Sequence, residues 1–227
     1  MARTVGIGIQ DFEKIIRNNC FYVDKTAFIK EWWENQDDVT LITRPRRFGK
    51  TLAMSMLEYF FSVEYADKGA LFEGLDIWKE EEYRGLQGSY PVIFLSFADV
   101  KETSFENARD KICRIIRSLY DRCSALLESE PNQKKLPDIF HEISPAMSDS
   151  VASYSLKVLS EFLADYYGKK VIILLDEYDT PMQEAYVYGY WDEMAAFVRN
   201  LFNSTFKTNP YMERAVMTGI TRLSKES

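Results

Sequence analysis

Four short apolar runs alternate along the chain with longer segments in which apolar residues recur every three or four positions. The runs are VTLIT at 39–43, YPVIFLSF at 90–97, KVIILLDEYD at 170–179 and RAVMTGITR at 214–222. Short and nearly continuous apolar runs are typical of strands that are buried on both faces of a parallel sheet. The pattern therefore predicts a strand at each of these places.

The segments between the runs carry the periodicity of amphipathic helices. Helices are predicted at 10–19, 24–36, 50–63, 103–126, 151–167 and 191–207. Asp24 is placed to cap the second of these helices, and Thr103 and Glu106 have the spacing of a capping box at the start of the longest. Gly168 is a good left-handed residue with which to end the helix before it.

Three stretches show neither the continuous apolar run of a buried strand nor the three-to-four-residue periodicity of an amphipathic helix. Segments 64–89 and 130–150 are rich in glycine, proline or charge, and an aromatic-rich stretch follows Pro181. All three are predicted to be turns and irregular connections. Strands that alternate with helices in this way indicate an α/β fold with a mostly parallel sheet and helices on both faces.

Composition sets limits on the class of protein. A chain of 227 residues with 46% hydrophobic residues can bury a substantial core, and its net charge of −7 argues against wholesale wrapping of nucleic acid. The three cysteines include no CxxC pair, so free thiols in a reducing, cytoplasmic setting are expected, and a single histidine disfavours a histidine-based metal site. No apolar stretch approaches the roughly 20 residues that cross a bilayer, so no membrane partner is expected.

Gly49, Lys50 and Thr51 lie at the turn from the first predicted strand into the next helix. In a phosphate-binding loop of the form GxxxxGK[ST], backbone amides surround the phosphates, the lysine reaches the β and γ oxygens, and the hydroxyl ligates magnesium. Arg44, followed by Pro45, stands where the first glycine of that pattern would be. The tripeptide thus predicts a phosphate site with an altered first half, and a solvated basic turn remains the alternative.

Asp176 and Glu177 follow directly on the last apolar residue of IILL in the third run. An aspartate at this place can complete a magnesium shell, and a neighbouring glutamate can polarise an attacking water. Because open α/β sheets bind ligands at the carboxyl ends of their strands, Asp176 and Glu177 are expected to face Lys50. The alternative is that they are only polar residues that begin a loop.

The fourth run adds two further candidates. If this strand lies between the first and the third, Thr218 at its end would face the γ-phosphate or the attacking water. Arg222 would then be placed to stabilise charge on the transferred phosphoryl group. A buried threonine at a strand end is also common as plain structure.

Four motifs in this order resemble the bacterial AAA-ATPase-like proteins, a family of P-loop ATPases. They are YVDKT at 22–26, RPRRFGKT at 44–51, LLDEYDTP at 174–181 and GITRLSKES at 219–227. In that family an arginine commonly replaces the first glycine of the Walker A loop, as here. The resemblance implies a P-loop NTPase fold, a three-layer α/β/α sandwich. Residues 39–227 would form the ATPase core, and residues 1–38 a helical segment packed on it.

The resemblance also implies a role for individual residues, with ATP and Mg²⁺ as the ligands. Lys50 and Thr51 would be the Walker A pair, Asp176 and Glu177 the Walker B pair, and Arg222 part of the sensor region. Thr51 and Asp176 are the expected metal ligands. The expected nucleotide contacts are Arg47, Phe48, Gly49, Lys50, Thr51 and Leu52. The expected catalytic residues are Glu177, Lys50, Arg222 and Thr218.

Family members often continue into a last core strand and a restriction-like nuclease domain. The sequence is therefore expected to be truncated after the sensor strand. The candidate partners of the full-length protein are a C-terminal nuclease domain, DNA and further copies of the chain. The process that ATP drives and the preference between ATP and GTP stay open.

Three alternatives remain. A nucleotide-binding switch or scaffold with negligible hydrolysis, regulating a nuclease or a DNA-associated partner, would use the same site. Direct nucleic-acid binding would use Trp32 and Trp33 with the arginine cluster Arg44, Arg46 and Arg47. At least one of the two tryptophans is expected in the core, because adjacent helical positions face different surfaces. Finally, Tyr22 or Phe21 could stack on adenine, or could only pack the N-terminal helices.

Overall fold

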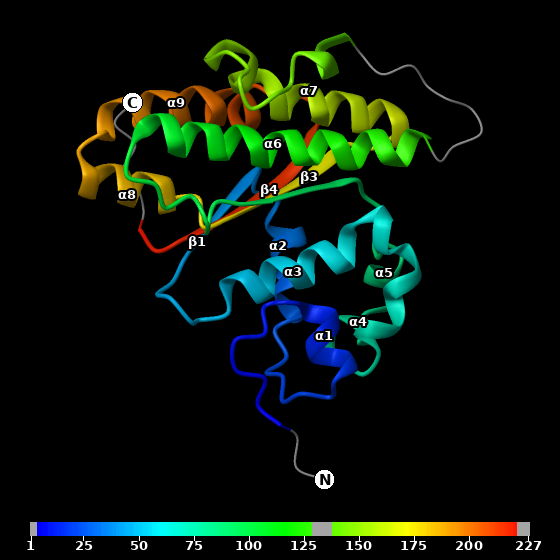
Figure 1. The fold of residues 1–227 in the computed structure, drawn as a ribbon. Helices are drawn as coiled ribbons and strands as arrows, with labels where there is room; N and C mark the ends of the chain where they lie inside the picture. The colour runs from blue at the N-terminus through cyan, green and yellow to red at the C-terminus, as the bar shows by residue number, and fades with distance from the viewer. Residues whose placement is uncertain (1–3, 129–137, 222–227) are drawn as a thin grey trace.

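A computed structural model describes residues 4–128 and 138–221, and it is built around a parallel sheet between two helical layers (Figure 1). The described residues form four strands: β1 (Val39–Thr43), β2 (Val92–Ser96), β3 (Val171–Asp176) and β4 (Met212–Gly219). The strand order is β1-β4-β3-β2, and every neighbouring pair is parallel. This confirms the α/β fold. It also places β4 between β1 and β3, as the hypothesis for Thr218 requires.

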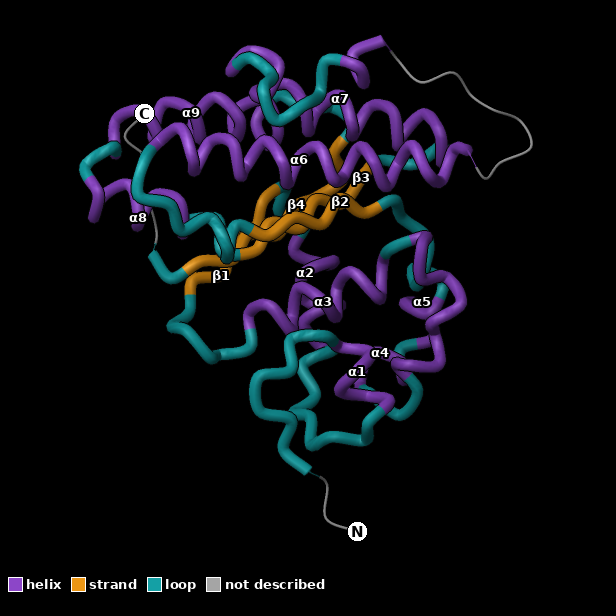
Figure 2. Tube along the Cα trace, viewed as in Figure 1, coloured by secondary structure: helices purple, strands orange, loops and turns teal. Residues whose placement is uncertain are grey.

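The helices form a layer on each face of the sheet (Figure 2). One layer contains α6 (Phe105–Glu128), α7 (Asp149–Tyr167) and α9 (Trp191–Phe202). The other contains α1 (Phe12–Arg17), α2 (Ala27–Asn35), α3 (Lys50–Phe61), α4 (Asp76–Lys79) and α5 (Glu81–Arg84). α8 (Thr180–Tyr188) follows β3 and packs against α9. Within the described residues, no helix is both long and apolar enough to span a membrane.

The central strand β3 shows why the sheet needs both layers. All of its residues are buried. Side chains alternate across a strand, so Ile173 and Leu175 join the core beneath α6, α7 and α9, while Ile172 and Leu174 join the core around α3. A strand that is apolar on both faces is stable only when both are covered.

The residues before β1 belong to the core on the α3 side. The backbone amide of Phe12 in α1 donates to Oγ of Ser55 in α3 at 3.0 Å. The ring of Phe12 stacks on Phe72, with centroids 5.0 Å apart. Trp32 of α2 is 1% exposed, and its indole Nε1 donates to Oγ1 of Thr40 in β1. The N-terminal helices therefore hold α3 and β1 in place.

Two stretches that were predicted to be irregular are helical in the structure. Segment 64–89 contains a 3₁₀ helix, Val63–Phe72, followed by α4 and α5. A 3₁₀ helix has three residues per turn, and a four-residue helix completes about one turn, so none of these helices produces a 3.6-residue period. The stretch after Pro181 forms α8, with the proline in its first turn, where it removes no helical hydrogen bond.

Both predicted N-caps were placed at the wrong residue. α2 begins after Thr26, and Asp24 instead accepts hydrogen bonds from the backbone amide and the hydroxyl of Thr26. At the start of α6, Oγ of Ser104 accepts from the amide of Asn107. The hydroxyl next to the predicted Thr103 therefore provides the cap. Gly168 does end α7 in the left-handed conformation, as predicted.

Candidate functional site

The carboxyl ends of the four described strands meet at one edge of the sheet. Thr43 at the end of β1 pairs with Gly219 at the end of β4, and Ser96 at the end of β2 pairs with Asp176 at the end of β3. The loop from β1 leads directly from this edge into α3 (Figure 1). Residues that follow these strands are therefore brought close to the first turn of α3.

The loop from β1 turns into α3 through a left-handed glycine. Gly49 has φ 78° and is the N-cap of α3, and Arg47 two residues earlier also has a positive φ, of 70°. No side chain caps α3, and its first turn contains no acidic residue. The first amides of a helix lack intrahelical partners and carry partial positive charge. The start of α3 is therefore suited to an anion.

Lys50 reaches back beneath this loop. It is 6% exposed, and its Nζ lies 3.2 Å from Oε1 of Glu177. The same ammonium donates to the backbone carbonyls of Arg44, at 3.1 Å, and Pro45, at 3.3 Å. A buried ammonium is costly unless it is paired and hydrogen-bonded, and these partners meet that need. The base of the loop and the end of β3 thus face one another through an ion pair.

Asp176 is fully buried and accepts hydrogen bonds from three hydroxyl groups. Its Oδ1 accepts from Oγ1 of Thr218 at 2.5 Å. Its Oδ2 accepts from Oγ1 of Thr51 at 2.9 Å and from Oγ of Ser96 at 3.4 Å. One carboxylate therefore joins the start of α3 to the ends of β2 and β4.

Glu177 has an unusual backbone conformation. Its φ of 52° lies in the left-handed region, which is uncommon for a residue other than glycine. Its amide donates to Oγ1 of Thr218 at 3.2 Å, and the amide of Tyr178 donates to the carbonyl of Thr218 at 2.9 Å. These bonds to β4 hold the turn in that conformation, in which the carboxylate meets Lys50. Strained backbone of this kind is common at functional sites.

Asp179 was not recognised in the sequence, although it is fully buried beside this turn. Its Oδ2 accepts from the amides of Ile220, at 2.9 Å, and Thr221, at 2.7 Å, and from Oγ1 of Thr221. Its Oδ1 has no hydrogen-bond partner in the described part of the chain. Asp179 thus ties the start of α8 to the segment after β4. Oδ2 also accepts from Nε2 of Gln183 at 2.8 Å, within α8. The partners after β4 lie more than 40 positions away, so spacing along the chain gave no signal for this link.

The structure brings five of the predicted site residues together: Lys50, Thr51, Asp176, Glu177 and Thr218. Arg47 and Phe48 lie on the exposed loop, with Phe48 60% exposed, and Leu52 is partly buried against the core on the α3 side. Arg222 lies outside the described residues. Ser96, which the sequence analysis did not select, could have been found by asking which other strand ends in a hydroxyl.

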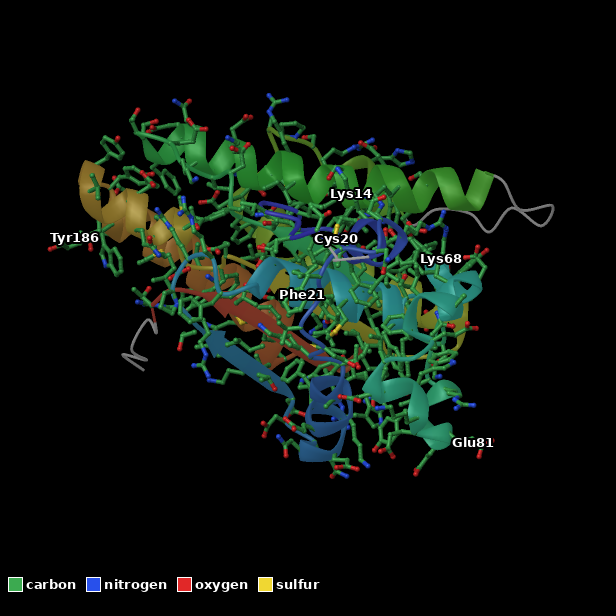
Figure 3. The ribbon with its side chains drawn as sticks, turned by 90° about the horizontal axis from the view of Figure 1, so that it is seen from below. Lys14, Cys20, Phe21, Lys68, Glu81 and Tyr186 are labelled. Atoms are coloured by element: carbon green, nitrogen blue, oxygen red, sulfur yellow. The ribbon has the colours of Figure 1, made fainter. Side chains whose placement is uncertain are left out.

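The aromatic candidates are largely taken up by packing. Trp32 is buried, as expected for at least one of the tryptophans, and the guanidinium carbon of Arg214 lies 4.4 Å from the ring centroid of Trp33. The Tyr22 hydroxyl donates to Sδ of Met56 at 3.4 Å, which favours the packing interpretation of this ring over adenine stacking. Phe21, by contrast, is 56% exposed, and it is labelled in Figure 3, where the molecule is seen from below.

Comparisons with known proteins point to one family. The model of the family described as "Predicted AAA-ATPase" matches residues 6–227. The chain is also 25% identical over 223 residues to a protein of Azotobacter chroococcum mcd 1 described as "Uncharacterized protein in vnfD 5'region". The match covers 97% of this chain and 38% of that protein, so the chain spans less than half of its relative's length. No solved structure matches the chain.

Proposed function

This chain belongs to the AAA-ATPase-like family of predicted AAA-ATPases, and from that premise we propose that it binds ATP with Mg²⁺ and hydrolyses it. The proposal rests on two neighbouring contacts. Lys50 forms an ion pair with Glu177, and the hydroxyl of Thr51 donates a hydrogen bond to Asp176. An ammonium, a hydroxyl and two carboxylates are the groups that phosphoryl transfer from a nucleoside triphosphate requires.

Phosphate binding would begin at the first turn of α3. The uncapped amides after Gly49 would donate to phosphate oxygens, and Lys50 would exchange its carbonyl partners for the β and γ oxygens. The buried position of Lys50 supports this role, because a charge pair is stronger where water is excluded. Arg47 and Phe48 would contribute through the loop backbone.

Thr51 and Asp176 would hold the magnesium ion. Their oxygens, Oγ1 and Oδ2, lie 2.9 Å apart, and magnesium prefers oxygen ligands of this kind, in company with substrate phosphates. When bound, the ion would neutralise negative charge on the phosphates. The hydroxyls of Ser96 and Thr218 would keep the Asp176 carboxylate oriented.

Glu177 would act as the base. It would leave the ammonium of Lys50 and accept a proton from the water whose oxygen attacks the terminal phosphorus, with ADP as the leaving group. Thr218, whose hydroxyl accepts from the Glu177 amide, would keep the turn in place, and Arg222 would stabilise charge on the transferred group. A nuclease domain, DNA and further copies of the chain are proposed partners of a longer protein. The unpaired thiols of the described residues support a cytoplasmic setting.

The proposal is tested by nucleotide binding and phosphate release. The parent chain should bind Mg·ATP and release phosphate, and Lys50→Ala should abolish binding. Glu177→Gln should bind ATP but release phosphate on the order of a hundredfold more slowly, as expected for the loss of a general base. Lys170→Ala, which removes an exposed ammonium just before β3, is the control and should match the parent. Equal ATP affinity of Lys50→Ala and the parent would show that the site is wrong.

A nucleotide-binding switch is the second candidate, and the ion pair between Lys50 and Glu177 favours it. In this arrangement the carboxylate of Glu177 is engaged with the ammonium of Lys50. A protein that kept this pair with ATP bound would hold the nucleotide without turning it over. Tight, magnesium-dependent binding of ATP by the parent without phosphate release would identify the switch.

A further inference from the structure

The segment YVDKT at 22–26 has no part in the site described so far, but two of its residues fasten it to the fold. Oδ1 of Asp24 accepts from the amide of Thr26 at 2.8 Å and from its hydroxyl at 2.7 Å, while Oδ2 accepts from the amide of Asp76 at 2.8 Å. Oγ1 of Thr26, which is fully buried, accepts from the amide of Ile77 at 3.1 Å. Asp24 and Thr26 therefore fix the start of α2 against the start of α4.

Tyr22 anchors the segment from the other side. Its ring packs edge-on against Phe12, with centroids 5.7 Å apart, and its hydroxyl reaches Met56 in the middle of α3. Burial raises the pKa of this hydroxyl to about 12, and a hydrogen bond with the backbone of Lys25 opposes that rise. The backbone at Lys25 is therefore fixed by the packing of Tyr22 and by the hydrogen bonds of its neighbours Asp24 and Thr26.

The side chain of Lys25 is exposed, and it extends to the loop that precedes α3. A Cβ built on Gly49 would lie 3.6 Å from Nζ of Lys25. Gly49 is the left-handed N-cap from which α3 begins. In the described part of the chain, Lys25 forms no ion pair and no side-chain hydrogen bond.

The charges around Gly49 and Lys25 favour the binding of an anion. The start of α3 carries partial positive charge, no acidic residue lies in its first turn, and the nearby Lys50 is already paired with Glu177. A second ammonium at this point is repelled by the helix end and has no counter-charge of its own. A phosphate group bound at the first amides of α3 would reverse that balance, because it would attract both the helix end and the ammonium.

We propose that Lys25 is a second phosphate-binding residue, which contacts the phosphate chain of the nucleotide at Gly49 from the N-terminal segment. The inference rests on the proposed function, since it assigns a further contact within the same nucleotide site. Within the segment YVDKT, Asp24 and Thr26 would then fix the backbone, and Lys25 would bind phosphate.

The test compares nucleotide affinities of Lys25→Ala, Lys25→Arg and the parent, with Lys170→Ala as the control. Loss of one charge-assisted contact should weaken Mg·ATP about tenfold in Lys25→Ala. Lys25→Arg should retain most of the affinity, and inorganic tripolyphosphate should compete less well for Lys25→Ala than for the parent. The midpoint of thermal unfolding without nucleotide should stay at the parent value, since Lys25 is exposed.

The outcomes separate this inference from the function on which it rests. If the parent and Lys170→Ala bind no nucleotide, the proposed function fails and Lys25 loses its ligand. If the parent binds Mg·ATP and Lys25→Ala binds it within twofold, the nucleotide site stands and the role of Lys25 is overturned. Weakened binding of ATP and tripolyphosphate together, with unchanged thermal stability, supports the role.

Discussion

Glu58 of α3 is a carboxylate that the fold partly buries, away from the candidate site. Burial raises its pKa to about 7, with Arg122 acting to lower it and Glu64 and Asp11 acting to raise it further. Between the unfolded pKa of 4.5 and about 7, the folded protein therefore binds more protons at this position than the unfolded chain does. The free energy of unfolding must fall as the pH rises through this window.

Replacing Glu58 with glutamine should remove this pH dependence. Glu58→Gln should be more stable than the parent at pH 8, by on the order of 2 kcal/mol. At pH 4.5 the two should be close, because Glu58 is then protonated in the folded state and about half protonated in the unfolded state. Denaturant unfolding at a series of pH values measures the difference. Glu81→Gln, on the exposed surface of α5 (Figure 3), is the control and should follow the parent curve. A constant difference across the whole range would show that Glu58 does not titrate in this window.

At the scale of elements, the end of β4 and the turn after β3 are fitted against each other. A Cβ built on Gly219 would lie 2.6 Å from Cε1 of Tyr178 and 2.7 Å from Oδ1 of Asp179. The hydroxyl of Tyr178 donates to the carbonyl of Thr221 at 2.8 Å, which closes the same junction from its other side. Even a methyl group at position 219 would push these elements apart.

Gly219→Ala is therefore expected to destabilise the protein by about 1–3 kcal/mol, the usual cost of overpacking a close contact. The matched control is Gly85→Ala, because a Cβ there would meet nothing closer than the carbonyl of Glu82 at 3.8 Å. Thermal unfolding of the two variants measures the difference. Equal midpoints would mean that Tyr178 and Asp179 can move aside without loss.

At the scale of the whole molecule, the candidate site links segments that are far apart in the chain. Thr51 of α3, Ser96 of β2 and Thr218 of β4 all donate to the one carboxylate of Asp176 in β3. The N-terminal segment joins them through Lys25 at Gly49. A ligand bound at the proposed site would therefore contact elements from distant parts of the chain and should stabilise the entire fold.

Mg·ATP at 100 times its dissociation constant should raise the free energy of unfolding by about 2.7 kcal/mol. Much of this gain should disappear with EDTA, and Asp176→Asn should lose the magnesium-dependent part. Thermal unfolding with ATP, with and without Mg²⁺, measures both effects. An unfolding midpoint that ATP and Mg²⁺ together leave unchanged would contradict the assignment of Thr51 and Asp176 as metal ligands.

The amino-acid sequence by itself determined the four strands, the longer helices and the residue types at the strand ends. These features follow from local periodicity and from the chemistry of neighbouring residues, which a single chain carries without its fold. The glycine, lysine and threonine at the start of α3 and the two carboxylates at the end of β3 were found in this way. The 3₁₀ helix and the two four-residue helices after α3 were missed because they produce no 3.6-residue period. α8, which begins at Thr180, was missed because Pro181 and the aromatic residues after it were taken to indicate a turn.

Only the tertiary structure decided which of these residues meet. The position of β4 between β1 and β3, the ion pair of Lys50 with Glu177, and the approach of Lys25 to Gly49 all join positions distant in the chain. The same holds for the burial of Glu58 and for the bonds from Asp179 to Thr221. Such contacts are set by how the sheet and its two layers pack through space, and no spacing along the chain records that packing.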